Sequence, residues 1–352
     1  MVNSEQSLPF VSVVMPIRNE EKAISRSLLA ALNQDYPANL LEVVIADGMS
    51  EDRTREVIQG IADVDGRVRV VDNQKRIMAS GFNTGLEHAK GDVIVMMGGH
   101  SEMAPDFVSV CTSALLEDRA KCVGGTIETI CSTGVGRAIA LAMTSTFGVG
   151  DCAFRTGTKE RKFVDTVAFG AYTRDAFSLV GKLDEEFVRA QDCEFNYRLR
   201  KRGAEIMFVP ELLTRYFSRA SLHTLWRQYY GYGFWKARIM QKHSRQMRPR
   251  HFVPAAFVLA LFVSALLAPF SFFGQLMFGA VAGSYLIANL AASVLAVRNG
   301  DWKLFPLLPI AFSILHISYG LGFLCCLIKY WNSWGDRSIA SSTTQEAPAT
   351  QS

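Results

Sequence analysis

Charge is missing from two long stretches of the 352-residue chain, and acidic side chains are missing from a third. No charged residue occurs in the 46 residues of Phe252–Val297 or in the 25 residues of Leu304–Ile328. Residues 215–251 contain nine Lys or Arg side chains and no Asp or Glu. Long apolar runs are typical of membrane helices, and a basic run before one is typical of the cytoplasmic side. The chain is therefore expected to be neither a purely soluble enzyme nor a purely polytopic transporter.

Cysteines at the spacing of a metal site are missing as well. The seven cysteines include no Cys-x-x-Cys pair, which argues against a zinc site or a disulfide framework and favours free thiols in a reducing compartment. Met1–Phe10 lacks an apolar core, so no cleavable signal peptide is expected. The net charge of +4 excludes a strongly basic nucleic-acid tail and an acidic disordered chain. We expect a cytoplasmic globular part and no nucleic-acid partner.

The uncharged stretches predict three membrane spans. Each is long enough to cross a hydrocarbon core of ~30 Å at ~1.5 Å per residue. The Lys and Arg residues predict that the 251 end and the 298–303 loop lie inside, with the 274 turn and the C-terminus outside. This sidedness implies an inner-membrane, multi-pass protein with a cytoplasmic catalytic domain. The predicted spans are Phe252–Phe273, Leu276–Val297 and Leu304–Ile328.

The segments flanking the spans carry their own signals. Residues 215–251 interleave aromatic and basic side chains, which predicts an interfacial helix in the headgroup layer, in contact with membrane lipids. His316, inside the third span, is either a functional group in the membrane or, more simply, a packing histidine. Residues 331–352 end in a Ser-, Thr- and Gln-rich run and are predicted to be a disordered tail. The domains are thus expected at 1–214, 215–251, 252–330 and 331–352.

The first 214 residues are predicted to form an α/β domain. Short apolar runs alternate with segments of helical spacing, which predicts a mostly parallel sheet with helices on both faces. Pro16 is expected to stop the first strand. Ligands of such sheets bind beyond the carboxyl ends of the strands. Three segments that follow strands are therefore expected to converge in space: Pro16–Glu20, Asp47–Thr54 and Gly98–Glu102.

The segment Asp47–Thr54 places a carboxylate at a strand end, followed by a turn glycine and several hydroxyl and acidic side chains. The simpler interpretation is a turn and a helix cap, in which Ser50 or Asp52 accepts the first free N–H groups of the helix. That interpretation accounts for Ser50, Asp52 and Thr54, but it does not require Asp47. A carboxylate there is suited to accept the N–H of a uracil or guanine ring.

These segments carry a resemblance to a known family. Val13–Gln34 together with Val43–Thr54 resembles a family 2 glycosyltransferase of GT-A fold, and the resemblance extends over roughly residues 10–330. Ala190-Gln191-Asp192 resembles the catalytic Glu-Asp or Gln-Asp motif of that family. Gln228–Lys236, followed by apolar spans, is most similar to bacterial exopolysaccharide transferases of the succinoglycan glucosyltransferase type. The resemblance implies a membrane-anchored hexosyltransferase whose donor is a nucleotide sugar, and UDP is the expected nucleotide.

The resemblance also implies roles for individual residues. Asp192 is the implied catalytic base, which removes a proton from the acceptor hydroxyl, although a helix-dipole role for this charge is the simpler alternative. Gly170, Ala171 and Tyr172 are implied at the acceptor and donor-sugar pocket, where a structural turn is equally compatible. Gln228 and Trp235 are implied near the diphosphate. The implied nucleotide-binding residues are Pro16, Arg18, Glu20, Asp47 and Arg76.

One position departs from the family pattern. Gly98-Gly99-His100 stands where the family carries Asp-x-Asp or Asp-Gly-His, so the first metal-binding aspartate is missing. Either Mn²⁺ or Mg²⁺ is held by His100, Glu102 and the donor phosphates, or basic side chains neutralise the diphosphate, or catalysis is impaired. The basic candidates are Arg18, Lys75 and Arg76.

The expected function is inverting transfer of a hexose to a membrane-associated, lipid-linked saccharide acceptor in polysaccharide biosynthesis. A polyprenyl-phosphate glycosyltransferase is one alternative, because those enzymes also carry a catalytic domain before membrane helices. The other is a catalytically impaired binding or scaffold subunit of a polysaccharide-assembly complex, which the glycine at position 98 keeps open.

Overall fold

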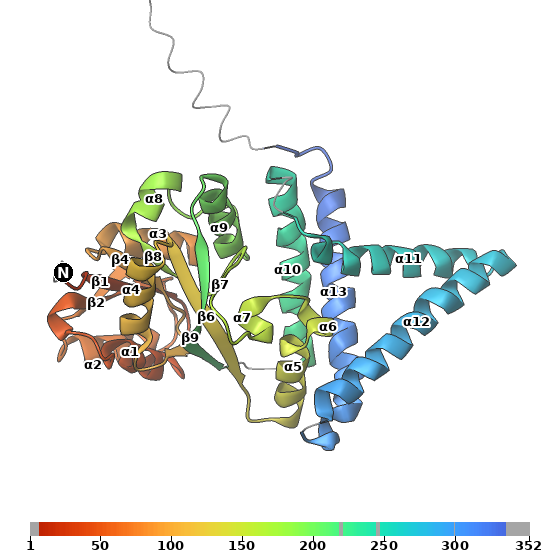
Figure 1. Ribbon diagram of the computed structural model, residues 1–352, viewed down its shortest axis with the longest axis horizontal. Helices are drawn as coiled ribbons and strands as arrows, with labels where there is room; N and C mark the ends of the chain where they lie inside the picture. Colours follow the sequence, from red (N-terminus) through yellow and green to blue (C-terminus); the bar gives the residue numbers. More distant parts are fainter. Residues whose placement is uncertain (1–6, 218–220, 244–246, 299, 336–352) are drawn as a thin grey trace, which may run out of the picture. The chain divides into compact units, whose positions relative to one another are not determined.

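A single sheet organises the N-terminal part of the protein (Figure 1). The computed structural model describes residues 7–217, 221–243, 247–298 and 300–335. Within these residues the nine strands follow the order β3-β2-β1-β4-β8-β6-β9-β5, and β7 pairs with β9. The strands are β1 Val11–Ile17, β2 Leu41–Asp47, β3 Val68–Asp72, β4 Val93–Met96, β5 Ser101–Met103, β6 Cys122–Ile130, β7 Lys162–Phe163, β8 Ala171–Thr173 and β9 Ile206–Phe217.

The sheet has a parallel half and a mixed half. The pairs β3–β2, β2–β1 and β1–β4 are parallel, as the alternation of strands and helices predicts. Beyond β4, strand β8 runs antiparallel to both β4 and β6, and β9 is parallel to β6 but antiparallel to β5 and β7. The α/β fold class is confirmed, and the candidate ligand loops follow the strands of the parallel half.

Strand β1 continues through Pro16, so the expectation that Pro16 stops the strand is wrong. Pro16 pairs with Ala46 of β2. The carbonyl of Val14 accepts the Met97 N–H on the β4 side of β1, and alternate residues of a strand present their backbone groups to the same side. Pro16 therefore faces the β4 side beyond Met96, where β4 has ended. Its missing N–H costs no ladder hydrogen bond there.

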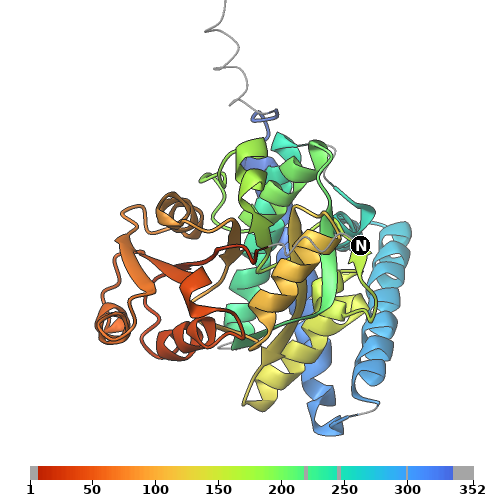
Figure 2. The same cartoon turned by 60° about the vertical axis from the view of Figure 1, so that its left-hand side comes forward.

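Helices cover both faces of this sheet (Figure 2). Strand residues alternate between the two layers, with Val13 and Val43 in one and Val14 and Val44 in the other, as a period of two requires. The first layer receives α1 Ile24–Leu32, α2 Thr54–Ala62 and α4 Phe107–Glu117, and the second receives α3 Met78–His88, α8 Arg174–Val180 and α9 Gln191–Lys201. The shorter helices are α5 Gly134–Thr144, α6 Thr146–Val149 and α7 Ala153–Thr156.

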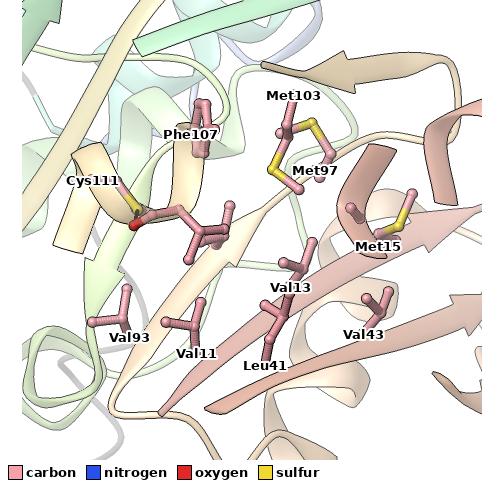
Figure 3. Close-up of a cluster of buried hydrophobic side chains, with 14 of the residues drawn as sticks. Val11, Val13, Met15, Leu41, Val43, Val93, Met97, Met103, Phe107 and Cys111 are labelled. Carbon is pink, nitrogen blue, oxygen red and sulfur yellow. Dashed lines mark hydrogen bonds between the residues drawn. The ribbon is translucent and has the colours of Figure 1, made fainter. Parts of the chain in front are cut away.

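The first layer forms the floor beneath the candidate loops (Figure 3). Val11, Val13 and Met15 of β1 pack there with residues of β4 and α4. Two more methionines, Met97 and Met103, lie in the same cluster and are 0% and 5% exposed. The candidate loops thus stand on a closed apolar core.

The described chain divides into two compact units. The first comprises Met1–Ser221 and Ala296–Leu308, and the second Leu222–Leu295 and Pro309–Ser352. The longer helices after residue 221 are α10 Leu222–Lys242, α11 Val253–Leu267, α12 Phe272–Val297 and α13 Leu308–Lys329, with short 3₁₀ turns at Pro249–His251 and Trp302–Leu307.

Three apolar helices follow residue 248, as the uncharged stretches predict. Pro249–Leu267, Phe272–Val297 and Trp302–Lys329 are long and apolar enough to cross a membrane. Their number agrees with the predicted spans, and their sidedness stays a prediction, as do the domain limits at 214, 251 and 330. The predicted disordered tail begins at residue 331, and all of it beyond residue 335 lies outside the described residues.

Candidate active site

The ends of β1, β2 and β3 form one edge of the parallel half of the sheet. The strand register pairs Ile17 with Asp47 and Asp47 with Asp72, so the three strands end level with one another. The loops that leave them begin at Arg18, Gly48 and Asn73. Pro16, Arg18, Glu20, Asp47 and Arg76 therefore belong to one side of the sheet, which is the arrangement expected of a nucleotide site.

The loop after β2 is bound to the loop after β1. The Asn19 N–H donates to Ser50 Oγ at 2.9 Å, and Asn19 Oδ1 accepts the Glu51 N–H at 2.9 Å. The Glu20 N–H donates to Thr54 Oγ1 at 2.7 Å. Side chains of each loop thus satisfy backbone groups of the other, so the two loops form one preorganised surface.

The helix-cap interpretation of the Asp47–Thr54 segment is only partly correct. Asp52 Oδ1 accepts the Thr54 N–H at 3.0 Å, which is a local bond at the start of α2. The N-cap residue of α2 is Arg53, however, and its side chain makes no cap hydrogen bond. The side-chain oxygens of Ser50 and Thr54 instead accept backbone N–H groups of the loop after β1. Sequence spacing alone cannot show this, because the partner residues are about thirty positions away.

Asp47 is fully buried at 0% exposure. Its Oδ1 accepts the Ser50 hydroxyl at 2.6 Å and the Ser50 N–H at 3.2 Å, and Oδ2 lies 3.8 Å from Nη1 of Arg55. The carboxylate thus holds the loop in shape from below. A role in base recognition stays a prediction, and the contacts in the structure favour an action through the Ser50 loop.

Replacing Asp47 by alanine should weaken UDP binding at least tenfold, which corresponds to about 1.4 kcal/mol. The loss follows whether Asp47 contacts the base or holds the loop, and Ser50→Ala separates the two roles. A base contact predicts near-normal UDP affinity in Ser50→Ala, whereas loop support predicts a loss in both variants. Isothermal calorimetry with UDP measures both affinities. Unchanged affinity in Asp47→Ala would remove Asp47 from the site.

Positive charge gathers over the same loops. Arg18 Nη2 lies 3.3 Å from Glu51 Oε1, and Arg76 Nη1 lies 3.5 Å from the same oxygen. Both guanidinium groups are partly exposed, at 37% and 49%. Lys75 instead pairs with Glu185 at 2.6 Å. Arg18 and Arg76 therefore meet at one exposed point beside the Asp47 loop, where they are suited to bind an anion.

Backbone strain is concentrated around this edge. Six described residues other than glycine have positive φ angles, and five of them flank the candidate segments. Asn19, Met49 and Arg76 follow β1, β2 and β3, while Phe169 precedes β8 and Ala190 precedes α9. Left-handed conformations in such residues cost free energy and persist where surrounding structure enforces them, often at functional sites. Local sequence patterns do not reveal this signal.

The Gly98–Glu102 segment contains few metal ligands. His100 Nδ1 lies 2.7 Å from Glu20 Oε1, and Glu102 is paired with Arg26. No group of three His, Cys, Asp or Glu side chains suited to a metal ion occurs among the described residues. The residues present therefore do not assemble a protein-based site for Mn²⁺ or Mg²⁺, which prefer several oxygen ligands.

Restoring an acidic residue at position 98 tests this conclusion. A Cβ atom on Gly98 would meet Ser101 Oγ at 3.4 Å and Phe169 Cε1 at 3.5 Å, both ordinary contacts. The hydroxyl of Ser101 is buried and has no hydrogen-bond partner within the described structure, so it is available to the new carboxylate. Gly98→Asp should therefore fold normally and bind Mn²⁺ at least tenfold more tightly in a calorimetric titration.

His100→Ala provides the control for this titration. If His100 and Glu102 already hold a metal with the donor phosphates, Gly98→Asp should change the affinity little, and His100→Ala should abolish it. If the parent chain is inactive with every donor and Gly98→Asp restores turnover, the impaired-subunit alternative is correct.

Asp192 lies in the first turn of α9, directly after the left-handed residue Ala190. Its side chain is partly exposed, and Oδ1 accepts the Cys193 N–H at 2.8 Å. The same first turn contains Glu194, which is 1% exposed and accepts hydrogen bonds from Arg198 Nε at 2.8 and 3.0 Å. Arg198 also donates to the carbonyls of Val180 and Lys182. Glu194 and Arg198 thus fix the start of α9 to the end of α8. Sequence reasoning missed this pair, although its i,i+4 spacing is a recognisable signal.

Tyr172 is a buried residue, and its predicted place at the acceptor and donor-sugar pocket stays a prediction. The side chain is 0% exposed and packs edge-on against Phe177 and Phe195, with ring centroids 5.7 and 5.4 Å away. Burial raises the pKa of the Tyr172 phenol well above its usual value. Gly170 and Ala171 are buried too, and a Cβ on Gly170 would lie 2.9 Å from the Tyr172 ring. Ala171 and Tyr172 belong to strand β8 and pair with β4 and β6, so this part of the segment is a buried strand and not a turn.

Gln228 and Trp235 belong to α10 in the second unit. Gln228 Nε2 donates to the Tyr232 hydroxyl at 3.0 Å, and the Trp235 ring lies edge-on to Phe234 at 5.5 Å. Their predicted role near the diphosphate stays a prediction.

Comparison with known proteins assigns the chain to a family. The model of the family described as "Glycosyl transferase family 2" matches residues 12–177. The succinoglycan biosynthesis protein ExoA of Rhizobium meliloti (strain 1021) is 30% identical over 88% of this chain and 93% of its own length. The chain belongs to glycosyl transferase family 2. It is an enzyme of that family, and the sequence resemblance is confirmed.

Two further relatives of this family 2 glycosyltransferase extend the comparison. A dolichyl N-acetyl-alpha-D-glucosaminyl phosphate 3-beta-D-2,3-diacetamido-2,3-dideoxy-beta-D-glucuronosyltransferase of Methanococcus voltae is 29% identical over 91% of this chain and 98% of its own length. The solved mannosyltransferase PcManGT of Pyrobaculum calidifontis, in complex with GDP-Man and Mn²⁺, covers 92% of this chain and 88% of its own. Its TM-score is 0.57 at 17% identity, so this likeness concerns the fold alone.

Proposed function

We propose that this family 2 glycosyltransferase moves a hexose from a UDP-linked donor to a lipid-linked saccharide, with inversion at the sugar carbon. The observation that carries the proposal is the pair of joined loops after β1 and β2, with Arg18 and Arg76 beside them. A nucleoside diphosphate needs polar contacts for its base and positive charge for its phosphates. Both are available at this one edge of the sheet.

Three side chains take part in the proposed reaction. The Asp192 carboxylate takes the proton of the acceptor hydroxyl as that oxygen attacks C1 of the donor sugar. The bond from C1 to the diphosphate oxygen breaks, and the nucleoside diphosphate leaves with its electron pair. Arg18 and Arg76 stabilise the charge that develops on the leaving group.

The nature of the acceptor follows from relatives and from the apolar helices. The relatives include a succinoglycan biosynthesis protein and a transferase named for a dolichyl-linked sugar phosphate, which supports a part in glycan biosynthesis on a lipid carrier. Three helices apolar enough for a membrane support anchoring at the inner membrane with the catalytic unit in the cytoplasm. The acceptor would then be presented at the membrane surface.

The impaired-subunit alternative is favoured by one observation. His100 and Glu20 offer at most two ligands, and Gly98 offers none. The mannosyltransferase of similar fold contains Mn²⁺, so a divalent metal remains part of the proposal for this chain, and the Gly98→Asp titration decides its place.

A transfer assay tests the proposed function. Purified full-length protein in detergent is offered UDP- and GDP-sugars with a polyprenyl-diphosphate-linked saccharide, in EDTA, Mg²⁺ or Mn²⁺. We expect UDP release coupled to product, and NMR should show an inverted anomeric centre. A retained configuration, or no turnover of any donor even by Gly98→Asp, would contradict the proposal.

A further inference from the structure

The hairpin formed by α11 and α12 exposes an unusually apolar tip. Phe270, Phe272 and Phe273 lie in or next to the turn between the two helices and are 86%, 79% and 66% exposed. No charged residue occurs anywhere from Phe252 to Val297. A turn that emerges into water on the far side of a membrane is normally polar, whereas this one presents three aromatic rings.

Helix α10 packs beside α13 and runs parallel to it (Figure 1). A Cβ on Gly233 would lie 2.0 Å from the Tyr319 carbonyl oxygen, and one on Gly322 would lie 2.0 Å from the Tyr230 carbonyl oxygen. Further along both helices, Gln241 Nε2 donates to the Tyr330 carbonyl at 2.9 Å. Small residues thus let the two backbones touch.

The polar character of α10 restricts where α13 can lie. Arg227 is exposed on α10 and Lys236 follows it, whereas Arg238 lies level with the end of α13, where it donates to the Ser333 carbonyl at 2.7 Å. If α13 crossed the bilayer, α10 would cross with it and carry Arg227 and Lys236 through hydrocarbon, which is costly. Helix α10 is instead suited to lie along the membrane surface, where its basic side chains reach headgroups and its apolar ones face lipid. Helix α13 carries no charge from Leu304 to Ile328 and lies there with α10 because the two helices are packed together.

The start of α11 leads to the same conclusion. Tyr319 marks the middle of α13, and close to it Gly320 packs on the Pro254 carbonyl, while Phe323 contacts the Phe252 ring at 5.8 Å. Arg248, Arg250 and His251 immediately precede Phe252. A membrane-crossing α13 would hold this basic segment inside the hydrocarbon layer, beside Phe323.

Helix α12 returns to the other half of α13. Asn289 Nδ2 donates to Ser313 Oγ at 3.1 Å, and the Tyr285 hydroxyl lies 3.0 Å from Nδ1 of His316. Both legs of the hairpin therefore join α13 along its length, and Figure 1 shows α11 and α12 meeting at a tip away from it. His316 has a packing partner here, in line with the simpler interpretation of that residue.

We propose that α11 and α12 form a re-entrant hairpin that enters the bilayer from the catalytic side and returns to it. Its partner is the hydrocarbon of the bilayer, with Phe270, Phe272 and Phe273 inserted deepest. Helices α10 and α13 lie together in the headgroup layer. This arrangement replaces the three crossings predicted from the sequence and rests on the proposed membrane anchoring, not on the transfer chemistry.

Site-resolved cysteine labelling in membrane vesicles tests the proposal. Three full-length variants carry one new cysteine each: Ser271→Cys at the tip, Asn332→Cys after α13, and Lys201→Cys on the catalytic unit, all at exposed positions. A membrane-impermeant maleimide is applied to inside-out and right-side-out vesicles, and peptide mass spectrometry quantifies each site among the native cysteines. We expect Asn332→Cys and Lys201→Cys to react from the same side, and Ser271→Cys to react at least tenfold less from either side until detergent is added.

Three results would overturn the re-entrant hairpin. They are labelling of Ser271→Cys from the side opposite Lys201→Cys, labelling of Ser271→Cys from the same side without detergent, and labelling of Asn332→Cys from the opposite side. Carbonate extraction of the same vesicles tests the underlying anchoring separately, because release of the protein would contradict membrane insertion of any kind. Neither measurement depends on turnover, so the transferase assignment is tested independently.

Discussion

Asp192→Asn should lower sugar transfer by a factor of roughly 10²–10⁴, the usual worth of a positioned general base. The amide is nearly isosteric with the carboxylate and can still accept the Cys193 N–H through its oxygen. Donor binding should therefore persist while the chemical step fails. Single-turnover rates together with calorimetric donor affinity separate these two quantities.

Asp175→Asn is the matched control for this experiment. Asp175 occupies the first turn of α8 as Asp192 occupies the first turn of α9, and it pairs with Lys121 on the exposed surface. If Asp192 serves only the helix dipole, both substitutions should have similarly small effects. Parent-like transfer by Asp192→Asn would refute the assigned base.

Glu194→Ala should destabilise the catalytic unit by about 3–5 kcal/mol, since breaking a buried ion pair leaves an uncompensated charge. Glu194 is 1% exposed, and its partner Arg198 is 20% exposed at the side chain. The carbonyls of Val180 and Lys182 would still hold the Arg198 guanidinium in place, so this group could not move into water when Glu194 is removed. Thermal unfolding of the full chain should show a clearly lower midpoint for this unit.

Glu56→Ala is the control, because it removes the acidic partner of a solvent-exposed ion pair. Glu56 bonds Arg53 at 3.0 Å, with the Arg53 and Glu56 side chains 73% and 67% exposed, and such solvent-exposed pairs contribute little to stability. Replacing Glu194 and Arg198 together by apolar residues should restore part of the loss. Equal shifts for Glu194→Ala and Glu56→Ala would show that burial of the pair does not matter.

Local periodicity predicted much of the fold. Helix α2 occupies Thr54–Ala62 as its apolar spacing indicates, and the strands β1 to β4 lie where short apolar runs place them. These features depend on neighbours within a few residues. The expectation for Pro16 failed because the effect of a proline in a strand depends on whether the adjacent strand extends past it, and β4 does not.

The candidate site was predictable in position but not in detail. Segments that follow the strands share an edge of a parallel sheet in any such fold, so the proximity of Pro16–Glu20 and Asp47–Thr54 was predictable. Arg76 was implied by the family resemblance, and the roles of these residues in nucleotide binding stay predictions. The bonds between Asn19 and the Ser50 loop, and the shared contact of Arg18 and Arg76 with Glu51, join distant residues and leave no periodic signal. The burial of Tyr172 likewise depends on Phe177 and Phe195 closing around it.

The methionines beneath the strand ends make the floor of the site deformable. Met15, Met97 and Met103 lie in one buried cluster under the loops (Figure 3). Their unbranched thioether chains can change rotamer and still fill the same volume, which branched aliphatic side chains cannot do as readily. A shift of the loops above would therefore not open a void below them. The thioethers also make this cluster sensitive to oxidation, because a sulfoxide on any of the three methionines would place a polar group in the buried apolar core.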